Sequence, residues 1–252
     1  VLGASKDTDG TYTSGSGGVM IYKIEGCSIG SASIDFDIEG IAQVAWSGNG
    51  KLITEQATLN TAAGQASTKG LINEGISSTT NFIRQKLTDL AIAYDASEST
   101  GDTTGIGSSD ITYSLTLTGG NITIENNLTY LTPESLGTVN QPLGHVMGTR
   151  SVSGNFTCYL NDVSNGSADL FENLVESTGL ITNAFALTFG IGGSGNTPSV
   201  DVAIPKAHLE LPSHSIDDVI GIEVNFHGLS SDLSSATASS SANEVSITYD
   251  AS

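Results

Sequence analysis

Residues 34–39 alternate three apolar side chains with three carboxylates, and this alternation constrains the fold more than any other feature of the chain. The apolar members are Ile34, Phe36 and Ile38, and the acidic members are Asp35, Asp37 and Glu39. Successive side chains of a β-strand point to opposite faces of a sheet. We therefore expect a strand with one face in a core and an acidic row on the other. Carboxylates about 7 Å apart on one face repel each other, so we expect the row to face water.

The charge of the whole chain agrees with this expectation. Asp and Glu number 27 against 8 Lys and Arg, which gives a formal net charge of −19. An acidic field of this size argues against tight binding to nucleic acid or to an anionic membrane. Charged residues make up only 14% of the chain, and Gly, Ser, Thr and Asn take their place. This composition is typical of all-β surface, virion and extracellular proteins. The alternative is that the acidity serves only solubility or a salty habitat.

Period-2 alternation recurs along the 252 residues, which allow one large β-domain or two small ones. We expect about ten strands separated by Gly, Ser, Asn and Pro turns, and hence an all-β sandwich or barrel-like fold. The expected strands lie at residues 19–24, 34–46, 111–118, 122–130, 152–160, 185–189, 200–204, 220–226 and 245–249. Gly119-Gly120 is expected to turn residues 111–118 into residues 122–130 as a hairpin.

One α-helix is expected to flank the sheets. It begins at the N-cap Ser167, has an apolar stripe of Leu170, Phe171, Leu174 and Val175, and closes at Gly179. Residues 81–94 fit both a helical stripe and a strand, and we favour a strand-rich structure there.

The domain boundaries follow from composition. We expect a flexible N-terminal arm at residues 1–18, a β-sandwich domain with loop insertions at 19–229, and a C-terminal linker and strand at 230–252. Long loops are expected at residues 11–18, 47–75, 96–110, 133–148 and 230–243. Loops of this length are unusual within one domain unless they become ordered against neighbouring subunits.

The sequence shows no membrane-spanning segment, and its two cysteines allow one disulfide at most. No apolar run approaches the roughly 18 to 20 residues that span a bilayer, so we expect no membrane partner. The polar start of the chain does not have the pattern of a signal peptide, which leaves open a signal that has been cleaved. Cys27 and Cys158 form one disulfide or, as we favour, are two unpaired small core residues.

The short motifs lack the structural context that chemistry requires. Residues 26–30 match G-x-S-x-G around Ser28, but a strand follows where a nucleophile elbow needs a helix. Residues 190–195 match G-x-G-x-x-G, again without a following helix to hold a phosphate. The four histidines lack metal-ligand spacing, and the Asn-x-Ser/Thr sequons fit the chance expectation for an Asn-rich chain. We therefore predict no catalytic residue, no cofactor and no metal site.

Several strand segments resemble those of the tail tube (major tail) proteins of long-tailed, siphovirus-type bacteriophages. The segments are residues 34–42 with Trp46, residues 113–124 and residues 148–154, and the resemblance continues in pieces from about Val19 to Leu229. It implies a β-sandwich with a flanking helix, and hexameric rings whose inner hairpins join into one barrel around a lumen. It also implies rings stacked through long loops and termini. Independently, joining strand edges between subunits removes exposed edges.

On this reading the protein polymerises into the hollow tail tube through which genomic DNA passes. Its partners are further copies of itself, the other tail proteins (tape measure, terminator and distal tail), and DNA in transient passage. Its location is the virion tail, assembled in the bacterial host cytoplasm. Asp35, Asp37 and Glu39 are the candidate lumen or solvated-interface residues. The alternative is a secreted or cell-surface adhesin or carbohydrate-binding β-sandwich with a Cys27–Cys158 bridge, and an enzyme is a third, poorly supported reading.

Overall fold

The computed structural model of the chain describes residues 11–13, 22–55, 58–60, 83, 85–96, 109–131, 144–176, 185–193, 198–216, 220–230 and 244–250. Several expectations fall outside these residues. They are most of the N-terminal arm, residues 97–108 of the loop expected at 96–110, the closure of the helix at Gly179, and residues 231–243 of the loop expected at 230–243.

The described residues are mostly β-structure. The strands are β1 (Thr11–Thr13), β2 (Tyr22–Glu25), β3 (Ser28–Asp37), β4 (Gln43–Asn49), β5 (Leu52–Glu55), β6 (Thr58–Asn60), β7 (Asp89–Tyr94), β8 (Ile111–Leu115), β9 (Leu117–Glu125), β10 (Leu128–Leu131), β11 (Gly144–Met147), β12 (Ser151–Tyr159), β13 (Phe185–Ile191), β14 (Ser199–Leu209), β15 (Ser213–Ile216), β16 (Ile220–Leu229) and β17 (Ser246–Asp250). The helical elements are the 3₁₀-helix η1 (Gln85–Leu87) and the α-helix α2 (Ser167–Glu176). In the described part of the chain, the prediction of an all-β fold with one flanking α-helix is confirmed.

The chain divides into two compact units, which are described separately. Unit 1 comprises Val1–Gly30, Ser47–Thr80 and Asn127–Gly148, and unit 2 comprises Ser31–Trp46, Asn81–Asn126 and Thr149–Ser252. The described part of unit 1 contains three two-stranded ribbons, β1-β6, β2-β5 and β10-β11. Unit 2 contains most of an 11-stranded sheet.

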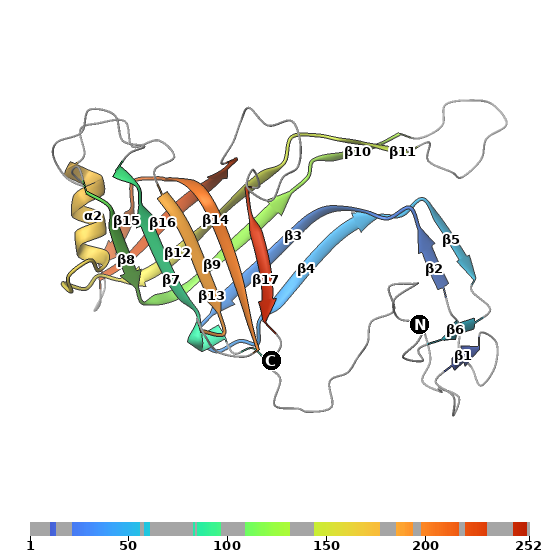
Figure 1. Ribbon diagram of the computed structural model, residues 1–252, viewed down its shortest axis with the longest axis horizontal. Coiled ribbons are helices and arrows are strands. Elements are labelled where there is room, and N and C mark those ends of the chain that lie inside the picture. Colours follow the sequence, from blue (N-terminus) through green and yellow to red (C-terminus); the bar gives the residue numbers. More distant parts are fainter. Residues whose placement is uncertain are drawn as a thin grey trace. The chain divides into compact units, whose positions relative to one another are not determined.

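The large sheet runs in the order β4-β3-β9-β12-β16-β14-β13-β7-β8, with β15 pairing β16 and β17 pairing β14 (Figure 1). Strand β14 changes partner along one edge, since residues 199–203 pair with β17 and residues 206–209 pair with β16. Its other edge pairs with β13, with a register shift between Phe185 and Leu187. This exchange lets one hydrogen-bonded sheet turn into two layers of a sandwich-like fold.

Four aromatic rings join the two layers. Phe189 on β13 lies 5.6 Å from Phe36 on β3 and 5.7 Å from Phe226 on β16, measured between ring centroids. Phe226 in turn stacks with Phe156 on β12 at 6.5 Å. All four side chains are at most 4% exposed. Such ring pairs each contribute about 0.5–1.5 kcal/mol beyond the burial of their area.

Gly120 explains why the predicted hairpin at Gly119-Gly120 is wrong. Both glycines lie inside β9, where Gly120 pairs with Phe36 on one side and Phe156 on the other. A Cβ at Gly120 would lie 2.8 Å from the Phe36 ring and 2.4 Å from the Asn155 carbonyl oxygen. The glycine therefore makes room for an aromatic ring and does not form a turn. Strand β8 pairs with β7, and the break between β8 and β9 falls at Thr116.

Helix α2 begins at Ser167, as the sequence predicts. The buried Ser167 hydroxyl donates to the Tyr159 carbonyl and accepts from the Asn161 amide, and Asp169 Oδ2 accepts from the Asn165 amide at 2.7 Å. These bonds tie the first turn to the end of β12. Leu170 and Leu174 are buried, but Val175 is 55% exposed, so its place in the apolar stripe was predicted wrongly.

The acidic strand ends earlier than its alternation indicates. Ile34 and Phe36 are buried as predicted, whereas Ile38 is 45% exposed and follows the last residue of β3. The Gln85 side chain accepts from the Asp37 amide at 3.2 Å and donates to the Asp35 carbonyl at 2.6 Å. Gln85 therefore occupies the edge of β3 at its end, and the chain bends away after Asp37. The prediction of a core position for Ile38 is wrong.

Part of the expected loop sequence forms strands. Residues 47–75 were expected to be a loop, but β4 continues to Asn49 and β5 and β6 follow within this range. Residues 144–147 of the expected loop at 133–148 form β11. Residues 11–13 of the expected loop at 11–18 likewise form β1. These four short strands, β1, β5, β6 and β11, lie in two-stranded ribbons with little apolar alternation, which is why the pattern did not reveal them.

The two cysteines are free. Cys158 is buried, and this burial raises the pKa of its thiol to about 11. Cys27 is exposed, so the expectation of two core cysteines holds for Cys158 alone.

Phe36 and its neighbour Asp35 provide a direct test of strand parity. We expect Phe36→Ala to lower the free energy of unfolding by about 3–5 kcal/mol, because it removes a buried ring that contacts Phe189. The control Asp35→Ala, on the opposite face, is expected to stay within about 0.5 kcal/mol. Urea denaturation of the two variants checks this, and equal losses would show that the assigned parity is wrong.

Candidate functional site: the polar face of the sheet

The outward side chains of four adjacent strands form one surface, which we call the polar face. Its members are Ser31, Ser33, Asp35 and Asp37 on β3, Asn121, Thr123 and Glu125 on β9, Ser151, Ser153, Asn155 and Thr157 on β12, and Glu223, Asn225 and His227 on β16. They alternate with the core residues of the same strands, such as Ile34, Ile122, Phe156 and Val224. The core parity therefore fixes which residues lie on the polar face.

The rows of the polar face run across the strands in register. Asp35 pairs with Asn121, Asn121 with Asn155, and Asn155 with Asn225. On one side of this carboxamide row, Ser33, Thr123, Ser153 and His227 form a hydroxyl-rich row. On the other side, Asp37 and Glu223 stand at the two ends of a row that also contains Gly119 and Thr157. The face thus presents amides and hydroxyls with carboxylates among them.

Strands β3, β9, β12 and β16 contain no lysine or arginine. On the neighbouring strand β14, Lys206 pairs with Leu229 beyond the polar face, and His208 pairs with His227. The only ionisable nitrogen on the polar face itself belongs to His227. A wall of this kind offers almost no fixed positive charge.

The three predicted acidic residues are all exposed, but they do not form one straight row. Asp35 and Asp37 project from β3 on the polar face. Glu39 lies in the bend after the strand, where its amide donates to Asp37 Oδ1 at 3.0 Å. The alternation therefore locates two of the three carboxylates on the sheet and the third beyond its end.

Glu210 adds a carboxylate at the edge of the polar face. Its oxygens accept from Asn225 Nδ2 at 2.9 Å and contact His227 Nε2 at 3.2 Å. Two hydrogen bonds lower the pKa of Glu210 below its ordinary value of 4.5. The larger effect comes from Asn225 and the smaller from His227. Together with Asn121, Asn155 and neighbouring residues, these groups line an open polar depression.

The carboxamide row was not anticipated from the sequence. By pattern, Asn121 and Asn155 belong to sequons that an Asn-rich chain forms by chance, and Asn225 belongs to no motif. A signal was present, because each asparagine lies next to a predicted core residue and so on the opposite parity. Its alignment across strands depends on the pairing register, which a sequence read one strand at a time does not contain.

Within unit 1, the structure brings Ser28 and His145 together. The Ser28 Oγ lies 3.0 Å from Nδ1 and 3.1 Å from Nε2 of the exposed His145, and Tyr130 beside it donates to the Asn49 carbonyl at 2.6 Å. Among the described residues, no carboxylate contacts His145. A nucleophile activated by a base also needs a group that orients the base. These contacts link the β10-β11 ribbon to Ser28 and Asn49 within unit 1, which is a structural role.

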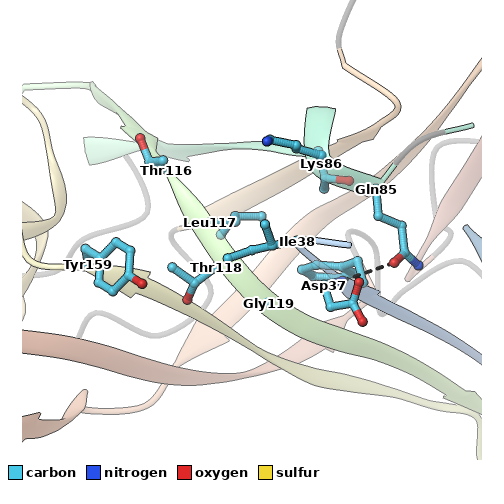
Figure 2. Close-up of a pocket in the computed structure, with 11 residues that line it drawn as sticks. Asp37, Ile38, Gln85, Lys86, Thr116, Leu117, Thr118, Gly119 and Tyr159 are labelled. Carbon is cyan, nitrogen blue, oxygen red and sulfur yellow. Dashed lines mark hydrogen bonds between the residues drawn. The ribbon is translucent and has the colours of Figure 1, made fainter. Parts of the chain in front are cut away.

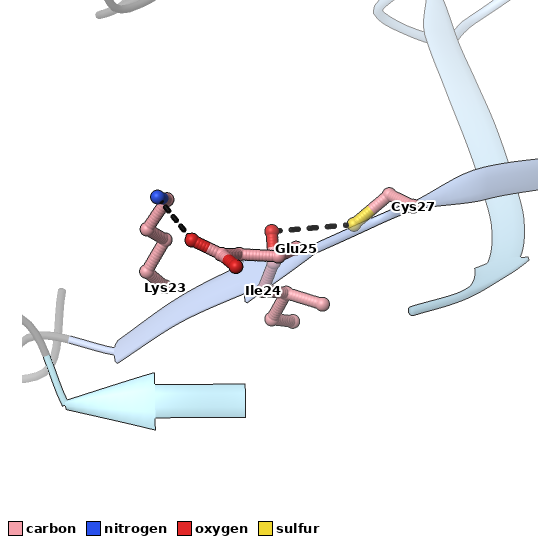
Figure 3. Close-up of polar contacts among 4 residues, drawn as sticks. All are labelled: Lys23, Ile24, Glu25 and Cys27. Atoms are coloured by element: carbon pink, nitrogen blue, oxygen red, sulfur yellow. Dashed lines mark hydrogen bonds and ion pairs between the residues drawn. The ribbon is translucent and has the colours of Figure 1, made fainter. Parts of the chain in front are cut away.

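The remaining motifs bring no chemistry together in the described residues. Gly190 and Ile191 belong to β13, and β14 follows the glycine-rich motif as the next described element. No cluster of metal-ligating side chains is found in the described part of the chain. Figure 3 shows the exposed Cys27 beside β2, where its sulfur lies 3.5 Å from the Ile24 carbonyl oxygen and Lys23 pairs with Glu25. No helix in the described ranges is long and apolar enough to cross a membrane.

The all-β fold and the polar face, which has no lysine or arginine, are features of a structural protein. Comparison with known sequences identifies its family. The sequence pattern of the family described as "Phage tail tube protein" matches residues 2–251. The chain therefore belongs to the phage tail tube proteins, and it is a structural component of a virion tail. It is 33% identical over 216 residues to the tail tube protein pb6 of Escherichia phage T5. That alignment covers 83% of this chain and 42% of the T5 protein, so the chain spans less than half of that relative.

The hydrogen bonds of Glu210 with Asn225 and His227 predict a pH dependence. Because its folded pKa is lowered, the contacts of ionised Glu210 stabilise the fold above pH 4.5 and are lost as the pH falls through the folded pKa. We expect Asn225→Ala, which removes the largest cause of the shift, to move the Glu210 titration midpoint upward. Carboxyl carbon NMR measures this directly. Thr123→Ala, a neighbouring change without a bond to Glu210, should leave the midpoint unchanged.

Proposed function

We propose that the chain polymerises as stacked hexameric rings into a hollow tube, with the polar face lining the lumen through which phage DNA passes. The single observation that carries this proposal is the polar face itself, in which four strands align hydroxyls, amides and carboxylates without lysine or arginine. The proposal includes no catalysis, and it includes contacts of the tube ends with the tape measure, terminator and distal tail proteins.

The electrostatics of DNA explain why such a wall is suited to a conduit. A duplex carries one negative charge per about 1.7 Å, and proteins hold it mainly through Lys and Arg contacts to phosphates. The carboxylates Asp35, Asp37, Glu125 and Glu223 repel phosphates, while the carboxamide row supplies weak and uncharged contacts. DNA inside such a tube remains hydrated and does not stick to fixed sites.

The free edges of the sheet supply a route to ring closure. Strand β4 is the end of the sheet order, and every residue from Gln43 to Asn49 is exposed, including Trp46 at 60%. On the far side of the same layer, β15 pairs only with β16 among the described strands. An edge with unpaired backbone groups is a template for another strand. Pairing β4 of one copy with β15 of the next is a head-to-tail contact, and such contacts form a ring when the rotation between successive copies closes.

Lysines on the β4 edge test the ring contact. We expect Val44→Lys with Trp46→Lys to abolish ring formation, because it places charges where a strand must pair. The matched control is Ile247→Lys with Tyr249→Lys on β17, an exposed strand outside this contact. Sedimentation and negative-stain microscopy should show monomers for the first variant and rings or tubes for the second. Rings formed equally well by both variants would contradict the role of β4.

Charge reversal tests the conduit. We expect Asp35→Lys with Asp37→Lys to leave tubes intact and to slow genome ejection, because new lysines bind phosphates. Raising the salt concentration should restore the rate, since counterion release weakens such contacts. The control Asp162→Lys with Glu172→Lys changes the net charge equally at two exposed positions, one before α2 and one on it, outside the polar face. The rate of genome ejection is measured at low and moderate salt for particles with the polar-face variant and for particles with the control variant. Normal ejection by the polar-face variant at both salt levels would count against the lumen assignment.

A further inference from the structure

An open pocket lies at one end of the layer that carries the polar face. It has a volume of about 230 Å³ and is lined by residues that include Phe36, Ile38, Leu117 and Tyr159 (Figure 2). These residues lie at or just after the end of β3, at the start of β9 and at the end of β12, and Gln85 and Lys86 of η1 also line the pocket. The pocket therefore lies at the strand ends and not along a strand edge.

The pocket is apolar at its base and is accessible from solvent. Phe36 is 4% exposed and Leu117 packs against the core, whereas Ile38 is 45% and Tyr159 50% exposed. An apolar cavity of about 150 Å³ holds a molecule the size of benzene. A pocket of about 230 Å³ thus has room for one large apolar side chain. Exposed apolar surface of this kind marks an interaction site when it is contiguous.

The position at the strand ends indicates which neighbour covers the pocket. When sheets join edge to edge into a barrel, their strands run along the barrel axis with a tilt of about 35–45°. Strand edges then face neighbours in the same ring, and strand ends face the adjacent ring. If the polar face lines the lumen, the Asp37 end of β3 faces the next ring in the stack.

Unit 1 supplies exposed apolar side chains. Its ribbons expose Ile24, Ile53, Leu131, Val146 and Met147, each by 44% or more. An isolated two-stranded ribbon is at best marginally stable in water, and packing against another surface stabilises it. One segment of unit 1, residues 127–148, connects the end of β9 to the start of β12. The pocket lies at the other ends of these two strands. When rings stack in one orientation, the strand ends at the pocket of one copy face the opposite strand ends of a copy in the next ring.

We propose that this pocket is an inter-ring socket, which receives an apolar side chain from the unit 1 ribbons of a second copy of this chain. The socket rests on the proposed function, because only the stacked tube brings these two surfaces together. It is separate from the β4 edge, which serves closure within a ring. Loss of the socket therefore leaves rings that do not stack.

Two full-length variants block the socket in different ways. Ile38→Asp places a charge at its mouth, and Thr116→Trp places a bulky ring at an exposed lining position. We expect both to keep the wild-type melting temperature and to form rings, with a critical concentration for tube growth raised at least about tenfold. The matched control Val175→Asp, at a 55% exposed site on α2, should form tubes as the wild type does. The two blocking changes differ in chemistry, so a folding defect in one leaves the other as a test.

The outcomes separate the socket from the tube proposal. Rings without tubes for both blocking variants support the socket. Normal tubes from either correctly folded variant overturn it and leave the proposed function standing. Monomers in place of rings would also overturn it, because the pocket would then act within a ring. Absence of rings and tubes from the wild type would instead contradict the proposed function.

A photocrosslinker identifies the occupant. Benzoylphenylalanine at position 116 in assembled tubes should give covalent dimers whose linked peptides come from residues 22–30, 47–60 or 127–148 of the second copy. Dimers linked to residues of unit 2, or no dimers at all in tubes that do assemble, would overturn the assignment of the occupant.

Discussion

The structure depends on the alternation between the two faces of a single layer of strands. Phe36, Phe156 and Phe226 project inward from β3, β12 and β16, and Phe189 contacts two of them from the opposite layer. Once these rings are buried, every neighbouring residue of the same strands must face the other way. Asn121, Asn155 and Asn225 then meet in one row because the strands pair in register around the aromatic core. The polar face is therefore a consequence of core packing.

Local alternation predicted the parts of the fold that each strand encodes by itself. The buried positions of β12, β13 and β16, the burial of Ile34 and Phe36, and the start of α2 at Ser167 all follow from short-range patterns. The errors occur where a distant residue decides. Gln85 ends β3 from 48 residues away, so Ile38 leaves the core. The Phe36 ring occupies the space beside Gly120, so two glycines that resemble a turn lie inside a strand.

The candidate site shows the same division between local and long-range information. The outward direction of Asp35 and Asp37 follows from parity alone, whereas the bend that removes Glu39 from the row depends on β3 ending at Asp37. The partners of Glu210 come from β16, and no spacing within one strand reveals them. The absence of Lys and Arg from four strands is visible in the sequence, but its meaning requires that these strands be adjacent.

The charge that suits a conduit also opposes assembly. Subunits with a formal net charge of −19 repel one another, and at physiological ionic strength this repulsion is screened beyond about 8 Å. Contacts that hold such subunits together must therefore be short-ranged and largely uncharged. The β4 edge has no ionisable residue between Gln43 and Asn49, and the pocket at the strand ends is apolar at its base. Backbone pairing and apolar burial can then hold a tube together while the carboxylates remain exposed on the polar face.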